Sequence, residues 1–221
     1  MPEKHFKPFS ILLPAPVWNL IAHAQKPIIV IEQRNEEQRW VAFSGFDFVN
    51  QKFLWRDVVL PEKWWVNLVA VEHGYAVLKV FESMENPDKT SLHFLSLEDG
   101  KILKDQPVET WAHTNKAIHP FQYLDGEPDF ETVKNFVQTK RKTMPRLGAE
   151  YLEWEGLIFI SYYSGDALAN YLAIFNEVGD CVYEEKIGTN LKGIGVNTFF
   201  IASGYLFFVK NKIELVTFRI V

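Results

Sequence analysis

The chain has 221 residues, of which 48% are hydrophobic and 15% aromatic, so it can build a sizeable core and is not intrinsically disordered. Its net charge of −5 argues against a nucleic-acid-binding protein, which needs a basic surface. A single cysteine, Cys181, excludes an intramolecular disulfide framework and a cysteine-based zinc site. No segment resembles a signal peptide or a membrane span. We therefore expect a soluble, cytoplasmic, single-domain protein covering residues 1–221.

The elements expected along the chain repeat as a short strand, a tight turn and a second, usually strongly apolar strand. The turns of the five copies fall at Gln25-Lys26, His73-Gly74, Asn115-Lys116, Glu155-Gly156 and Ser203-Gly204. Their spacings are 48, 42, 40 and 48 residues. A period of about 40 to 45 residues with four strands per copy is typical of a β-propeller.

The N-terminal segment, residues 6–13, is an apolar strand without a partner in the first copy. The last copy stops after its third strand, residues 213–221, and therefore lacks a fourth. Pairing of these two segments would close the ring and remove an unpaired edge. We expect an all-β, five-bladed propeller closed by its N- and C-terminal strands.

A second turn recurs before the outermost strand of each regular copy, and residues 98–103 (Glu-Asp-Gly-Lys-Ile-Leu) are its clearest example. This segment resembles the end of quinoprotein-type propeller blades. It lacks the closing tryptophan of those blades, although Trp55 has the equivalent position in the first copy. The resemblance supports the repeat and implies no quinone, and we expect no cofactor.

The third copy is irregular. Pro120 interrupts its second expected strand, residues 118–123. Apolar residues then follow at helical spacing in residues 130–139, with Asp129 placed to cap a helix. We expect a short helix there, although the β-branched residues of this segment also suit a strand.

The fourth copy, residues 150–187, has the most regular pattern. Its segment 157–163 is an almost continuous apolar run, as in a strand buried on both faces, and its last strand, residues 181–186, is half charged, as suits a sheet edge. Segments 150–153, 160–163, 191–195 and 198–200 resemble an uncharacterised bacterial family of single-domain, propeller-like proteins. That resemblance implies the fold and assigns no activity.

Two groups of residues are candidates for ligand binding. The first is aromatic and begins the innermost strands, near the mouth of the expected channel: Trp18, Trp65, Trp111 and Tyr151. These rings could stack on a sugar, a base or a peptide side chain, or they could fill the space between blades. The second group is basic and connects the third and fourth copies: Arg141, Lys142 and Arg146. It could attract an anionic ligand or an acidic partner, or it could be an ordinary solvated loop.

Acidic residues on inner strands suggest the alternative of a carbohydrate-active hydrolase. Glu109 and either Glu150 or Glu153 would be its paired carboxylates, unless they are simply charged strand ends. The histidines, among them His23 and His113, predict no metal site. We favour a non-catalytic, monomeric module that binds an unknown protein or a small anionic ligand and neither nucleic acid nor membrane.

Overall fold

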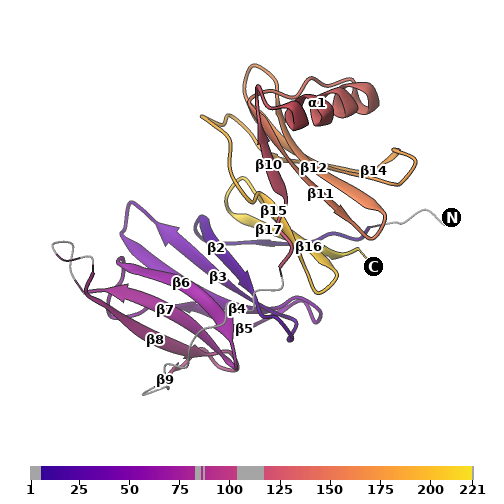
Figure 1. Cartoon of the computed structure of the whole chain (residues 1–221). Coiled ribbons are helices and arrows are strands. Elements are labelled where there is room, and N and C mark those ends of the chain that lie inside the picture. The colour runs from indigo at the N-terminus through magenta and orange to yellow at the C-terminus, as the bar shows by residue number, and fades with distance from the viewer. Residues whose placement is uncertain (1–5, 83–85, 87, 104–116, 221) are drawn as a thin grey trace. The chain divides into compact units, whose positions relative to one another are not determined.

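The computed structural model describes residues 6–82, 86, 88–103 and 117–220, and the strands of these residues form four antiparallel sheets (Figure 1). The chain divides into two compact units. Leu13–Ala117 is called here the inserted unit, because it lies between the two segments, Met1–Leu12 and Ile118–Val221, of the terminal unit. Each unit is described separately.

The inserted unit contains two four-stranded meanders (Figure 1). The strands of the first are β2 (Val17–Ala22), β3 (Ile28–Asn35), β4 (Trp40–Asp47) and β5 (Lys52–Val58). Those of the second are β6 (Val66–Glu72), β7 (Tyr75–Phe81), β8 (Thr90–Ser96) and β9 (Ile102–Leu103). Both follow the pattern expected for the first two copies.

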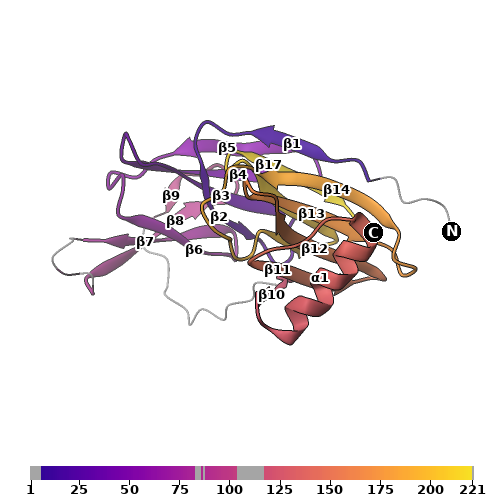
Figure 2. The ribbon, with the colours of Figure 1, turned by 90° about the horizontal axis from the view of Figure 1, so that it is seen from above.

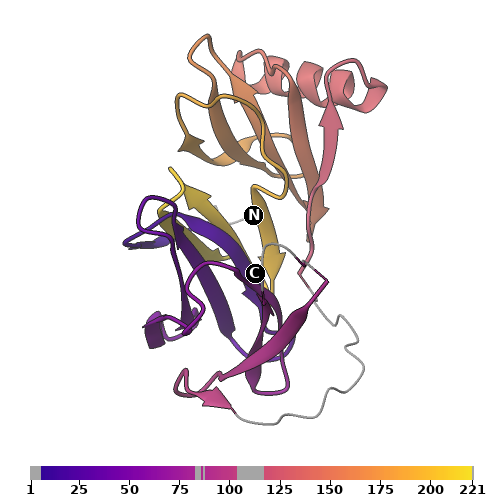
Figure 3. The same ribbon diagram turned by 90° about the vertical axis from the view of Figure 1, so that its left-hand side faces the viewer.

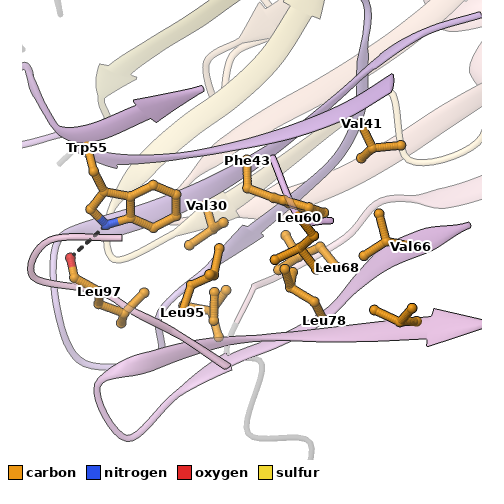
Figure 4. Close-up of a cluster of buried hydrophobic side chains, with 13 residues drawn as sticks. Val30, Val41, Phe43, Trp55, Leu60, Val66, Leu68, Leu78, Leu95 and Leu97 are labelled. Atoms are coloured by element: carbon orange, nitrogen blue, oxygen red, sulfur yellow. Dashed lines mark hydrogen bonds between the residues drawn. The ribbon is translucent and has the colours of Figure 1, made fainter. Parts of the chain in front are cut away.

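One hydrophobic core joins these two meanders (Figure 4). Val30 and Phe43 of the first sheet pack in the same cluster as Leu68, Leu78 and Leu95 of the second. At one end of the cluster, Trp55 of β5 donates its indole N–H to the carbonyl oxygen of Leu97 at 3.0 Å. The two sheets therefore pack face to face and are also joined by a buried hydrogen bond.

The terminal unit contains a five-stranded and a four-stranded sheet. The first has the order β10 (Phe121–Leu124), β11 (Gly148–Trp154), β12 (Leu157–Ser164), β13 (Ala169–Phe175) and β14 (Cys181–Gly188). The second has the order β1 (Phe9–Leu12), β17 (Glu214–Arg219), β16 (Tyr205–Lys210) and β15 (Phe199–Ala202). The helix α1 (Pro128–Arg141) covers one face of the five-stranded sheet (Figure 2, Figure 3).

The expected helix is confirmed and is longer than predicted, since it extends over Pro128–Arg141 rather than residues 130–139. Phe130, Val133 and Val137 lie on its buried face. Asp129 was expected to cap the helix, but it lies in the first turn, and the N-cap residue is Glu127 without a side-chain capping bond. The 14-residue α1 is too short to cross a membrane, and the described ranges contain no other helix that qualifies.

The predicted pairing of the two ends of the chain is confirmed. β1 lies antiparallel to β17, with Phe9 opposite Thr217 and Leu12 opposite Glu214 (Figure 2). Phe6, just before β1, packs its ring 5.2 Å from that of Phe218. The sheet that begins with β15 is thus completed by a strand from the other end of the sequence.

The third copy differs from the regular pattern. Its strand β10 pairs with β11 and so becomes the fifth strand of the fourth copy's sheet, and α1 follows it. Residues 109–113, the other expected inner strand, lie outside the described residues. The described residues therefore form four sheets, and the number of five blades and the single domain stay predictions.

Tight glycine turns join the first two strands of the second, fourth and fifth copies. The turns His73-Gly74, Glu155-Gly156 and Ser203-Gly204 join β6 to β7, β11 to β12 and β15 to β16. Both residues of each turn have positive φ, the requirement of the tight turns that suit twisted hairpins. The repeated X-Gly pairs in the sequence therefore mark real hairpins.

Candidate binding surface

Two of the predicted aromatic residues are exposed in the inserted unit. Trp18 lies in β2 with 61% of its surface exposed, and Trp65, just before β6, is 40% exposed. The register of β2 against β3 shifts between Val17 and Asn19, so Trp18 occupies an irregularity of the ladder. Such a bulge redirects a side chain away from the regular alternation. The nearby backbone thus presents the Trp18 indole to solvent.

Arg34, at the end of β3, holds this region together. Its guanidinium carbon lies 4.8 Å from the centroid of the Trp18 ring and 5.7 Å from that of Trp64. Nη2 donates to the carbonyl oxygen of Val66 at 2.7 Å and to Oδ1 of Asn67. A cation over an indole face is attracted by the ring quadrupole. The exposed Trp18 ring therefore rests on a side chain that is itself fixed.

The positive charge of Arg34 is neutralised by Glu32 on the same face of β3. Arg34 Nε donates to Glu32 Oε1 at 2.7 Å, and the two side chains are only 12% and 1% exposed. Glu32 Oε2 accepts the backbone N–H of Leu68 at 2.7 Å. Burial raises the pKa of Glu32, and the bonds from Leu68 and Arg34 oppose that rise. This pair joins β3 to β6 across the sheet interface.

The segment between β5 and β6 is held in its conformation by the side chain of Glu62. Glu62 Oε1 accepts the backbone N–H groups of Trp64 at 2.8 Å and Trp65 at 2.9 Å. The N–H of Val41 donates to the carbonyl oxygen of Lys63 at 2.6 Å, which places the β3–β4 turn beside this connection. We call Trp18, Arg34, Trp64 and Trp65 the tryptophan surface.

The other two predicted aromatic residues are not part of this surface. Trp111 lies outside the described residues. Tyr151 belongs to β11 of the terminal unit, where its hydroxyl donates to Oε1 of Glu153. Of the four predicted rings, Trp18 and Trp65 are exposed in the inserted unit, and the rings that lie over Arg34 are those of Trp18 and of Trp64, which was not predicted.

The basic connector is predicted to offer its charges to an anionic ligand, and each of its two arginines contacts a carboxylate in the described structure. Arg141 Nε donates to Glu184 Oε1 at 2.8 Å and Nη2 to Oε2, and Tyr162 also donates to Glu184 at 2.8 Å. Arg146 Nη1 lies 3.2 Å from Asp166 Oδ1. Lys142 is exposed and forms the left-handed C-cap of α1. Arg141 therefore has a structural contact in this unit.

The carboxylates of the hydrolase alternative have different environments. Glu150 in β11 is 0% exposed, and it accepts the N–H groups of Asn197 and Thr198 and the Thr198 hydroxyl. Burial raises the pKa of Glu150, and these hydrogen bonds oppose the rise. Glu153 lies three positions further along the strand and so faces the opposite side. Glu109 lies outside the described residues.

The histidines have structural contacts in the described chain. Nδ1 of His23 accepts the backbone N–H groups of Gln25 and Lys26, both at 3.0 Å, and burial lowers its pKa. His23 thus stabilises the turn between β2 and β3. Residues 6–82, 86, 88–103 and 117–220 contain no group of three or more acidic, histidine or cysteine side chains suited to a metal ion. His113 lies outside these ranges.

Sequence reasoning missed Glu32 and Arg34. The segment 28–34 reads Ile-Ile-Val-Ile-Glu-Gln-Arg, and its two opposite charges are separated by one residue. In a strand, residues two apart share a face. Opposite charges on one face at the end of a buried strand are a signal from which this ion pair could have been predicted.

The described residues define an all-β fold of antiparallel meander sheets that includes the helix α1. A model of a domain of unknown function, DUF4905, matches residues 22–103. The match lies within the inserted unit and includes Glu32, Arg34, Trp64 and Trp65, whereas Trp18 precedes it. No curated protein matches the chain. The match is consistent with the predicted resemblance to an uncharacterised family. A bacterial origin and the quinoprotein-type resemblance stay predictions.

Proposed function

We propose that this protein is a non-catalytic binding module whose tryptophan surface holds a protein partner. One observation supports the proposal most: an indole that is 61% exposed, that of Trp18, is stacked on an arginine whose charge is already neutralised. Large apolar rings kept in water and fixed in place are suited to association, because little side-chain entropy is lost when a partner covers them.

The chemistry of the surface favours a protein over a small anion. Arg34 is paired with Glu32 and has little charge left to attract an anionic ligand. Exposed residues of both signs lie on the turn and connection beside it: Glu36, Glu37, Arg39 and Lys63. A centre of tryptophan and arginine with a polar rim is typical of protein interfaces, where these two residue types dominate the binding energy.

The proposal includes a propeller architecture. It is supported by meander sheets that pack face to face within each unit, by the recurring X-Gly hairpins and by β1 completing the last sheet. No observation favours the hydrolase alternative, since the Glu150 carboxylate is inaccessible and Glu153 faces away from it. A cytoplasmic location and a monomeric state stay predictions.

The test compares capture by the wild type with capture by Trp18→Ala. Proteins retained by the wild type and lost by the variant are identified, purified and titrated by calorimetry. We expect Trp18→Ala to weaken such a partner at least tenfold, about 1.4 kcal/mol, as at an interface hot spot. The control is Phe121→Ala, which removes a 70% exposed ring in the terminal unit and should bind as the wild type does.

Two results would overturn the proposal. One is a purified partner that binds Trp18→Ala and a Trp18→Ala/Trp65→Ala double variant with unchanged affinity. The other is displacement of every captured protein by a neutral oligosaccharide that binds the same two indoles, because the natural ligand would then be a sugar.

A further inference from the structure

A cavity of about 270 Å³ that is open to solvent on one side lies in the terminal unit between α1 and the five-stranded sheet. None of its walls comes from the inserted unit. The residues that matter here are Tyr123 of β10, Tyr151 of β11, and Asp129, Thr132, Val133 and Phe136 of α1. An engineered cavity of about 150 Å³ holds a benzene molecule, so this one has room for a small organic ligand.

The periodicity of both elements brings these residues to one place. Asp129, Val133 and Phe136 are spaced by four and three positions, so they share one face of the helix. On the sheet, Tyr123 is opposite Ala149, and Tyr151 follows Ala149 by two positions. Tyr123 and Tyr151 are therefore diagonal neighbours on the same face of adjacent strands. Helix and sheet each contribute aromatic rings to the wall.

The wall combines aromatic rings with one carboxylate. Tyr123, Tyr151 and Phe136 line it with aromatic side chains, whose ring faces carry negative partial charge, and Asp129 adds a carboxylate from an exposed position in the first turn of α1. Among the described residues, no lysine, arginine or histidine lines the cavity. The Tyr151 hydroxyl donates a hydrogen bond to Glu153, and burial together with this bond raises the pKa of Tyr151, so its side chain stays a neutral phenol.

The cations of α1 are engaged elsewhere. Lys134 Nζ lies 2.9 Å from Glu131 Oε1, and Lys140 Nζ donates to the carbonyl oxygen of Val178 at 3.4 Å. Arg141 is paired with Glu184. These side chains do not compensate the charge of Asp129 through a direct ion pair.

We propose that this cavity binds a small quaternary or methylated ammonium group. Aromatic faces attract a cation that is bulky and weakly hydrated, and a neighbouring carboxylate adds the opposite charge. A primary amine or metal ion would lose a strong hydration shell to apolar walls, whereas methyl groups fit against Val133 and the rings. The site is separate from the tryptophan surface and does not depend on it.

The experiment titrates the full chain with choline and with its neutral isostere, 3,3-dimethylbutan-1-ol. The two have the same shape and differ in charge. We expect choline to bind at least about tenfold more tightly than the alcohol, because the cation–π and carboxylate contacts need the charge. Tyr151→Leu should weaken choline by a similar factor and leave the alcohol unchanged.

The matched control uses two acidic residues in the first turn of α1. Asp129→Asn removes the charge in the wall and should weaken choline about fivefold or more. Glu131→Gln removes the same charge from the same turn without lining the cavity and should leave choline affinity unchanged. Circular dichroism of both variants checks that α1 is retained.

Three results would overturn the proposal, and the first two need no variant. The wild type could show no binding of choline at about 10 mM, a concentration that saturates even weak sites. Choline and the alcohol could bind equally, which would make the cavity a merely apolar one. Asp129→Asn and Glu131→Gln could have equal effects, which would mean that the helix charge acts at long range.

Discussion

The guanidinium of Arg34 lies 4.8 Å from the Trp18 ring while its Nε donates to the buried carboxylate of Glu32 at 2.7 Å. One side chain therefore joins an exposed indole to an ion pair inside the inserted unit. The same pair is hydrogen-bonded to the backbone of β6, because Glu32 accepts the N–H of Leu68 and Arg34 donates to the carbonyl oxygen of Val66. Any change in the packing of the two meanders will thus alter the support of the Trp18 ring.

Removal of Arg34 should destabilise the inserted unit. In Arg34→Ala, Glu32 is left as a buried charge without its cation, a change that typically costs about 3–5 kcal/mol. Urea unfolding followed by tryptophan fluorescence measures the loss. Arg39→Ala, which removes an exposed arginine five positions away, should change stability by less than about 0.5 kcal/mol. A double variant, Glu32→Gln with Arg34→Met, should recover part of the lost stability. Equal unfolding midpoints for Arg34→Ala and Arg39→Ala would contradict the stabilising role of the Glu32–Arg34 pair.

The buried Glu150 predicts a specific pH dependence. Its pKa in the folded protein lies above the ordinary value of 4.5, because burial disfavours the charged carboxylate. The folded state then binds this proton more tightly than the unfolded state, so the contribution of Glu150 is fully present below about pH 4.5 and declines as the pH rises through the folded pKa.

The test compares the wild type with Glu150→Gln, which cannot titrate. We take the difference between the free energies of unfolding of the wild type and the variant, in which the contributions of the other carboxylates cancel. This difference should decrease as the pH rises from 4.5. Glu155→Gln, at an exposed turn position, serves as the control and should give a flat difference. A flat difference for Glu150→Gln as well would show that its pKa is unchanged on folding.

Gly45 should not tolerate a methyl group. A Cβ atom there would lie 2.5 Å from Cε2 of Trp55, whose indole is held by Leu97. The ring must move in a filled core, and such overpacking costs about 1–3 kcal/mol. Gly193→Ala is the control, because a Cβ at Gly193 meets nothing within 4 Å. Thermal unfolding should separate the two variants clearly, and adding Trp55→Phe to Gly45→Ala should restore part of the stability.

Deletion of β1 should leave β17 without its partner. A chain that begins at Pro14 loses the β1–β17 ladder and the contact between Phe6 and Phe218. We expect self-association through the open edge, visible in size-exclusion chromatography, and loss of cooperative unfolding. A chain that begins at Phe6 keeps both contacts and should behave as the full chain does. Cooperative melting of the shorter chain within a few degrees of the longer one would rule out this role of β1.

Local features of the fold could be predicted from sequence. The hairpins follow from X-Gly pairs, because glycine adopts positive φ without strain. The helix follows from the spacing of Phe130, Val133 and Val137, which form its buried face. The pairing of β1 with β17 follows from two apolar segments that each lack a partner.

Features that depend on partners far away in the sequence could not be predicted from it. The pattern of β10 marks a strand but does not say that it joins β11. An exposed and a buried tryptophan look alike in a sequence, so Trp18 and Trp55 are distinguished only by their neighbours. Arg34 and Arg141 bind groups 32 and 43 positions away, and nothing local reveals those contacts.

The order in which the chain emerges from the ribosome gives the β1–β17 pair a further consequence. The sheets of the inserted unit need only residues 17–103, so they can form while translation continues. The last sheet needs Phe9–Leu12 together with Glu214–Arg219, so β1 has no partner until about 200 further residues have been synthesised. During that interval it is an apolar strand without a ladder, open to chaperones and to β1 of a neighbouring nascent chain. A pause in translation after residues 17–103 have left the ribosomal exit tunnel, but before residues 214–219 are made, would prolong that interval and would leave a complete inserted unit joined to an unpaired strand.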